Sequence, residues 1–160
     1  MFFHHEFEPP ELVKTMEENG YGNLEPAISP ERLRALCEDD PTLLSCYESM
    51  NNYCNRYAHD VFNMMHEQKV IEEMREKGED TKEIYAELVV IDKNRHNLHE
   101  AMMDSVNLVS RELAKRNKDN EWMRDLVAGG RAAYARFALL TFYNLYCTMK
   151  TPSESNSQQP

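Results

Sequence analysis

The chain has 160 residues, of which 41% are apolar and 29% are charged, so the composition predicts one folded domain and excludes an extensively disordered protein. Its formal net charge of -10 lies in the first half: residues 1–80 hold 18 acidic and 7 basic residues, and residues 81–160 hold 10 and 11. An acidic surface repels phosphate backbones, so no nucleic-acid partner is expected.

The cysteines and the apolar runs indicate the compartment. Cys37, Cys46, Cys54 and Cys147 form no C-x-x-C pair, and the opening MFFHHEFEPP lacks the basic and apolar parts of a secretory signal. The most apolar stretch, FALLTFYNLYC, is shorter than the ~20 residues that a membrane helix needs. We therefore expect a cytoplasmic protein with reduced thiols, no membrane association and no cofactor.

The N-terminal part, residues 1–41, is predicted to form an extended arm and one or two short helices that pack on the rest of the chain. Two prolines at Pro9 and Pro10 suit the first turn of a helix that ends near Asn19. A second start signal is Ser29 as the N-cap, with a proline directly after it.

Three long helices are predicted to follow, over about 42–77, 82–117 and 121–149. Apolar residues in the first of them recur alternately three and four positions apart, which is typical of helices that pack nearly antiparallel. The sequence therefore predicts an all-α fold, with an up-down-up bundle of three long helices over residues 42–150.

Polar residues mark the ends of these helices. Gly78 is expected to terminate the first long helix, and Asp80 or Thr81 to begin the second. The last ten residues, TPSESNSQQP, show no apolar periodicity, so residues 151–160 are predicted to be a disordered tail.

The middle of the second long helix carries charged residues on its apolar side. Arg95 falls at the centre of the apolar stripe, with Asp92 and His99 one turn before and one turn after it, at the edge of the stripe. Because an unpaired buried charge is costly, we interpret the three residues as a structural polar layer that fixes helix packing.

The same region also allows a metal site or an acid–base site. Asp92, His96 and His99 lie within two turns of one helix, and histidine with carboxylate is a common ligand set. However, no second helix clearly adds a ligand, and no catalytic motif is present, so no catalytic residue is predicted. The metal site remains an alternative to the polar layer.

The last long helix is apolar on every side. Leu139, Phe142, Tyr143 and Tyr146 point in several directions, and Arg136 is the single charged residue between Ala132 and Met149. A helix of this kind must be covered, either by the N-terminal helices or by a second copy in a twofold homodimer, and we favour the homodimer interface. The Gly129–Gly130 pair is expected to break or kink this helix.

The stretch IDKNRHNLHEAMMDSVNLVSREL resembles a family of small all-helical domains of unknown function from Gram-positive bacteria and their mobile elements. The residues that carry the resemblance are Asp92, Arg95, His99, Ala101, Asn107 and Arg111. The closing segment GRAAYARFALLTFYNLY is similar to the last helix of that family. The resemblance implies a helical domain and suggests no activity.

These observations favour a non-enzymatic helical module for interaction or regulation, whose partner is a second copy of the chain or another protein. One alternative is a metal-binding or hydrolytic bundle that uses the His/Asp cluster. Another is an acidic inhibitor that mimics nucleic acid, because residues 6–40 hold ten acidic and three basic residues.

Overall fold

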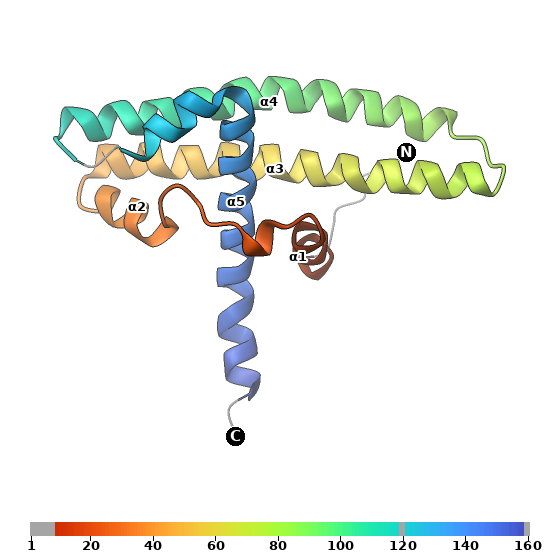
Figure 1. The fold of residues 1–160 in the computed structure, drawn as a ribbon, viewed down its shortest axis with the longest axis horizontal. Coiled ribbons are helices and arrows are strands. Elements are labelled where there is room, and N and C mark those ends of the chain that lie inside the picture. The colour runs from red at the N-terminus through yellow and green to blue at the C-terminus, as the bar shows by residue number, and fades with distance from the viewer. Residues whose placement is uncertain (1–8, 119–120, 159–160) are drawn as a thin grey trace.

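A computed structural model describes residues 9–118 and 121–158 of the chain. Every regular element within these residues is a helix, which confirms the all-α class. In chain order the elements are α1 (Pro9–Glu18), the 3-10 helix η1 (Tyr21–Asn23), α2 (Pro30–Cys37), α3 (Pro41–Glu76), α4 (Lys82–Lys115) and α5 (Trp122–Gln158) (Figure 1).

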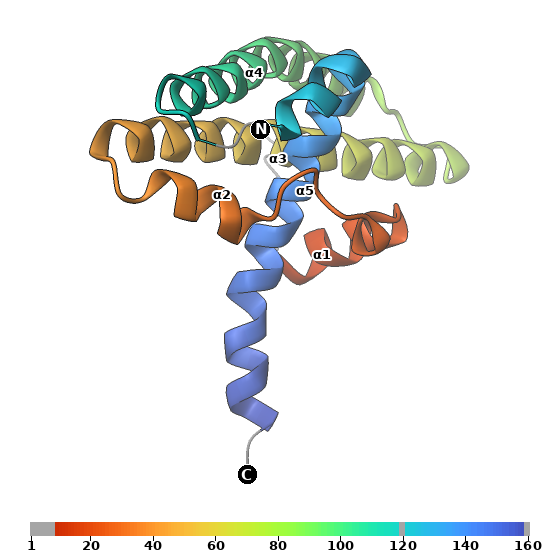
Figure 2. The same cartoon turned by 60° about the vertical axis from the view of Figure 1, so that its left-hand side comes forward.

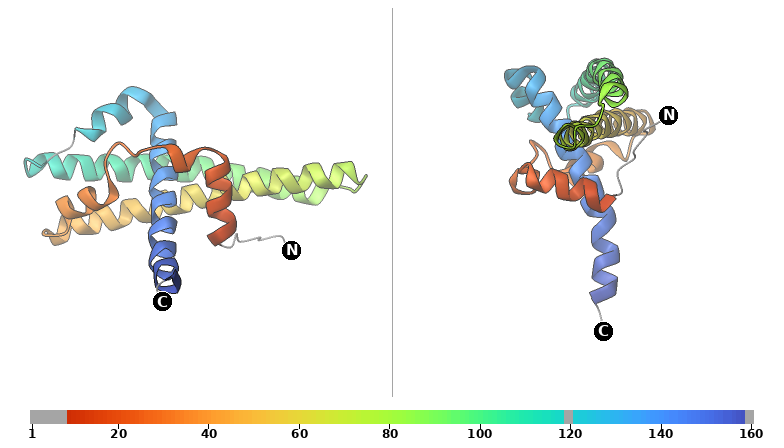
Figure 3. Two further views of the ribbon diagram at one scale, coloured as in Figure 1. Left: turned by 60° about the horizontal axis from the view of Figure 1, so that its bottom comes forward. Right: turned by 90° about the vertical axis from the view of Figure 1, so that its right-hand side faces the viewer.

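The framework of the fold is an antiparallel hairpin of α3 and α4, which lie side by side along their whole length (Figures 1 and 3). The predicted signals at its ends are confirmed. Gly78 lies two residues after Glu76, the last residue of α3, and its φ of 72° is one that glycine adopts without strain. The Asp80 carboxylate then accepts a hydrogen bond from the backbone N–H of Lys82, at 3.0 Å, where α4 begins.

Helix α5 does not continue the predicted up-down-up bundle. Gly130 lies inside it with φ 67° and ψ -155°, a non-helical conformation that joins two helical segments and confirms the expected kink. The segment before Gly130 begins near the end of α4 and rises obliquely away from it, and the segment after Gly130 changes direction and crosses the hairpin (Figures 1, 2 and 3). The periodicity of the sequence could not reveal this change of direction, because it arises from one backbone residue.

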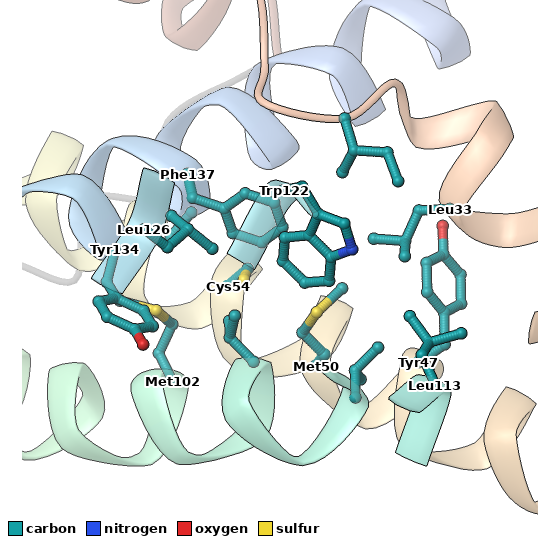
Figure 4. Close-up of a cluster of buried hydrophobic side chains, with 14 of the residues drawn as sticks. Leu33, Tyr47, Met50, Cys54, Met102, Leu113, Trp122, Leu126, Tyr134 and Phe137 are labelled. Atoms are coloured by element: carbon teal, nitrogen blue, oxygen red, sulfur yellow. The ribbon is translucent and has the colours of Figure 1, made fainter. Parts of the chain in front are cut away.

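The main core lies where α2, the hairpin and the first part of α5 meet (Figure 4). The ring of Trp122 stacks on that of Phe137, with centroids 5.5 Å apart. Met50 from α3, Met102 from α4 and Leu33 from α2 pack around this aromatic pair and are all buried. Because α2, α3, α4 and α5 all contribute side chains to this cluster, burial of these side chains holds the four helices together.

Ion pairs fasten the end of α4 to the corner between α2 and α3. The Arg116 guanidinium bonds to the Asp40 carboxylate at 2.6 Å and to the Glu112 carboxylate at 2.9 Å. Lys118 donates to the backbone carbonyl of Leu36 and pairs with Asp39, at 2.6 and 2.8 Å. Asp40 also caps α3, because it accepts hydrogen bonds from the first backbone N–H groups of that helix.

Two ends of the structure extend beyond the packed centre. The far end of the hairpin reaches past α5 and α1, so among the described helices α3 and α4 pack only on each other there (Figures 1 and 3). At the other end, α5 continues to Gln158, whereas the sequence predicted a disordered tail from residue 151. Adding residues to an existing helix is easier than nucleating a new one, so a polar segment without apolar periodicity can still extend a helix.

We expect Gly130→Ala to lower the free energy of unfolding by about 1–3 kcal/mol, because its φ and ψ are accessible essentially to glycine alone. No atom lies within 4 Å of an added Cβ, so the loss is conformational rather than steric. Gly130→Asn should be no milder, since asparagine tolerates the left-handed helical region but not this ψ. Chemical denaturation measures the effect, with the exposed Ala132→Ser as control. Equal stability of Gly130→Ala and the wild type would contradict the kink.

Candidate functional site

Arg95 and Asp92 form a half-exposed ion pair on α4. Arg95 donates from Nη2 to the Asp92 carboxylate at 2.7 Å and from Nε to the same oxygen at 3.2 Å. The side chains are 23% and 43% exposed, so the pair lies at the edge of the core and not within it. The hydrogen bond from Arg95, against a smaller effect of desolvation, holds the pKa of Asp92 below its ordinary value.

His99 is buried, but it is bonded to α5 and not to this ion pair. Its Nε2 lies 3.2 Å from the backbone carbonyl of Arg131, directly after the kink, and its ring packs edge-on against Tyr57, with centroids 5.2 Å apart. A carbonyl can only accept, so Nε2 carries the proton and the buried Nδ1 is left without a hydrogen-bond partner. The predicted layer is therefore two contacts: Arg95 with Asp92, and His99 with the kink of α5.

The alternative metal set, Asp92, His96 and His99, does not converge on one point. Nε2 of the exposed His96 lies 3.8 Å from the Asp92 carboxylate, but it also lies 3.1 Å from the Arg95 guanidinium, whose charge opposes a cation. His99 uses its Nε2 on the carbonyl of α5. Among the described residues, no group of three or more His, Cys, Asp or Glu side chains could hold a metal ion.

The proposed homodimer residues are covered within the chain. Leu139 and Phe142 are buried, and Tyr143 and Tyr146 are half-buried. They pack with side chains of α1, η1 and α3, and the rings of Phe142 and Phe62 stack with centroids 6.1 Å apart. Of the two coverings considered from the sequence, the N-terminal helices therefore cover this face. A homodimer interface at these residues stays a prediction, and periodicity could not show that α1 packs here.

Beside this covered face, a cleft of about 800 Å³ opens between α3, α4 and α5. From α3 its lining includes Arg56, His59 and Asp60; the other helices add amide and aromatic side chains. Loss of hydration raises the pKa of Asp60, although the charges of His59 and Arg56 act in the opposite direction. No sequence signal marks this cleft, because these residues lie away from the apolar seam of α3. The cleft forms only where α5 crosses them.

A second surface lies on the part of the hairpin that extends past α5. Tyr85, Val89 and Val90 on α4 are 52%, 53% and 58% exposed, and Ala86 beside them is exposed too. Ala86, Val89 and Val90 follow Tyr85 by one, four and five residues. This spacing places the four side chains together on the side of α4 that points away from α3. We call these four residues the tip patch. It is unusual because the outer face of a hairpin helix is ordinarily polar.

Searches of known protein families, curated proteins and solved structures found no match to this chain. Among the described helices, none is both long enough and apolar enough to span a membrane. All four cysteines are free thiols, and burial raises the pKa of Cys54 to about 12 and that of Cys37 to about 11. Both buried thiols therefore stay protonated and unreactive at neutral pH.

We expect acid to destabilise the protein through His99. Burial lowers the pKa of His99 below its ordinary value of 6.5, with the bond to the Arg131 carbonyl acting in the opposite direction. As the pH falls through 6.5, the unfolded chain binds the proton before the folded chain does, so stability is lost from that pH downward. The unfolding midpoint should fall between pH 7.5 and 5.5, and fall less in His99→Phe. The exposed His96→Gln serves as control, and identical pH profiles for wild type and His99→Phe would refute this assignment.

Phe142→Ala is expected to reduce the free energy of unfolding by about 3–5 kcal/mol, because it empties a buried aromatic site between α1, α3 and α5. Leu145→Ala, one turn on and 40% exposed, should cost far less. Denaturant titration at two protein concentrations measures both. A loss of stability that depends on concentration would mean that a second copy covers Phe142 instead.

Proposed function

We propose that the protein is a non-enzymatic helical interaction module that binds another protein through the tip patch. The proposal rests on the exposed apolar side chains of Tyr85, Val89 and Val90, which lie on a two-helix segment that no other described helix covers. Two-helix segments bury only one side of each helix, and an added helix would bury the patch. A cytoplasmic setting accords with the four free thiols.

The surroundings of the patch favour a basic partner over a second copy of the chain. Residues 72–87 hold seven acidic and three basic side chains, and all but one of the acidic ones are exposed. Two such tips would repel each other if they met face to face. A helix with an apolar stripe and lysine or arginine at its borders would instead place opposite charges against the rim of the patch.

The other functions considered have less support. The acidic-inhibitor alternative needs unpaired acidic charge in residues 6–40, but Asp39 and Asp40 pair with Lys118 and Arg116. The metal-binding or hydrolytic alternative needs its ligands to converge, and His99 bonds to α5 away from Asp92. The resemblance to helical domains from mobile elements stays a prediction, and it suggests neither an activity nor a partner.

Replacing both valines of the tip patch by serine should weaken binding of a basic amphipathic helix by at least about tenfold, because each valine loses apolar contact. The probe is a designed peptide with a leucine stripe bordered by lysines, measured by fluorescence anisotropy; a second peptide carries glutamates in place of the lysines. Val127→Ser is the matched control, since Val127 is 63% exposed on α5 and lies outside the patch.

The proposal fails if the lysine peptide does not bind, or if Val89→Ser/Val90→Ser binds it as well as the wild type does. It also fails if the two peptides bind equally, because the acidic rim would then have no role. Sedimentation tests whether a second copy of the chain binds the tip patch instead. Self-association that the two substitutions abolish would identify a second copy as the partner.

A further inference from the structure

Two opposite charges on the floor of the cleft stay apart although their spacing permits an ion pair. Arg56 and Asp60 are four residues apart on α3, and they form no ion pair or hydrogen bond with each other or with any other described residue. Arg34 and Glu38 have the same spacing and the same order on α2, and they lie 3.8 Å apart as a surface pair. The comparison indicates that local geometry holds the two charges of the cleft apart.

An aromatic ring accounts for the position of Arg56. The guanidinium carbon lies 5.7 Å from the centroid of the Tyr53 ring, one turn earlier on α3, within the range of a cation–π interaction. Arg56 is thus drawn toward the start of α3, while Asp60 lies one turn further along. The cleft therefore presents a positive group and a negative group side by side.

Of the two charged groups, the Asp60 carboxylate would be stabilised more by a ligand than the Arg56 guanidinium would. It is half-buried, and its pKa is raised because burial disfavours the charged carboxylate. A carboxylate in such a place is stabilised by a cation that reaches it within the cleft. Arg56 weakens the binding of a purely cationic ligand at this site, because it contributes positive charge nearby.

The other side chains that line the cleft indicate which further groups a ligand would carry. Asn94 and Asn97 on α4 offer amide groups that can donate and accept hydrogen bonds, and Leu145 and Tyr146 on α5 offer apolar surface. The volume of about 800 Å³ is within the range of sites that hold small molecules.

We propose that this cleft binds a small zwitterion of the short-peptide class, with its ammonium group against Asp60, its carboxylate against Arg56 and an apolar side chain against the α5 wall. Opposite charges at the two ends of the ligand match the two separated charges of the protein. Peptide groups between them match the amides of α4. Neither an amine nor a carboxylic acid alone satisfies both charges.

The site is independent of the tip patch, because it uses none of the residues between Tyr85 and Val90. A failure of one proposal therefore leaves the other unaffected, and the Val89→Ser/Val90→Ser variant should bind a zwitterionic ligand normally.

The test uses the dipeptide Gly-Phe as the probe, with its N-acetylated form and its C-terminal amide, in isothermal titration calorimetry on the full chain. Gly-Phe should bind saturably at millimolar concentration or below, and each blocked form at least tenfold more weakly. Asp60→Asn and Arg56→Gln should each weaken Gly-Phe at least tenfold. Glu38→Gln and Arg34→Gln remove the same charge types from the paired site on α2, and they should leave binding unchanged.

Absence of saturable binding by Gly-Phe overturns the proposal, and so does binding that either cleft substitution leaves intact. Equal binding of all three peptides would show that apolar contact alone fills the cleft, which also contradicts it. Thermal unfolding of Asp60→Asn and Arg56→Gln verifies that a lost signal is not a lost fold. Because both side chains are outside the buried core, their melting temperatures should match the wild type.

Discussion

The arrangement of the whole protein depends on the backbone at Gly130. Its φ of 67° and ψ of -155° separate α5 into two directions, so that one segment completes the core and the next crosses the hairpin. If α5 were straight, its apolar residues after the kink could not reach α1 and α3 together. The bond from His99 to the carbonyl of Arg131 fixes α4 against the point where the direction changes. One residue without a side chain thereby decides which surfaces are buried.

The charged side chains of the helices show how the surroundings decide what an ion pair does. Arg95 and Asp92 lie at the core edge and bond closely, while Arg116 joins Asp40 and Glu112 to fasten two corners of the fold. These pairs neutralise charge within the chain. Asp60 lies in the same molecule without such a partner, because the neighbouring cation faces an aromatic ring. Charge in the cleft therefore remains available to a ligand, whereas charge at the corners of the fold does not.

The tip patch and the cleft are two surfaces that neither the core nor the ion pairs of the fold use. They differ in chemistry, since the tip patch is apolar within an acidic rim and the cleft carries both signs of charge beside aromatic side chains. They are also built differently. The tip patch exists because α5 does not reach the end of the hairpin, and the cleft exists because α5 crosses its middle. The position of α5 therefore accounts for both surfaces, because α5 covers the middle of the hairpin and leaves its end uncovered.

The sequence by itself determined the all-helical class, the kink at Gly130 and the ends of α3 and α4, because caps, turns and periodicity act between residues close in the chain. It also placed Arg95 beside Asp92, since residues three apart on a helix are neighbours. Only the tertiary structure decided that α1 covers Phe142, that His99 faces α5, and that His59 and Asp60 line a cleft. Those outcomes depend on the direction that α5 takes after Gly130, and periodicity within a helix carries no information about how that helix crosses another.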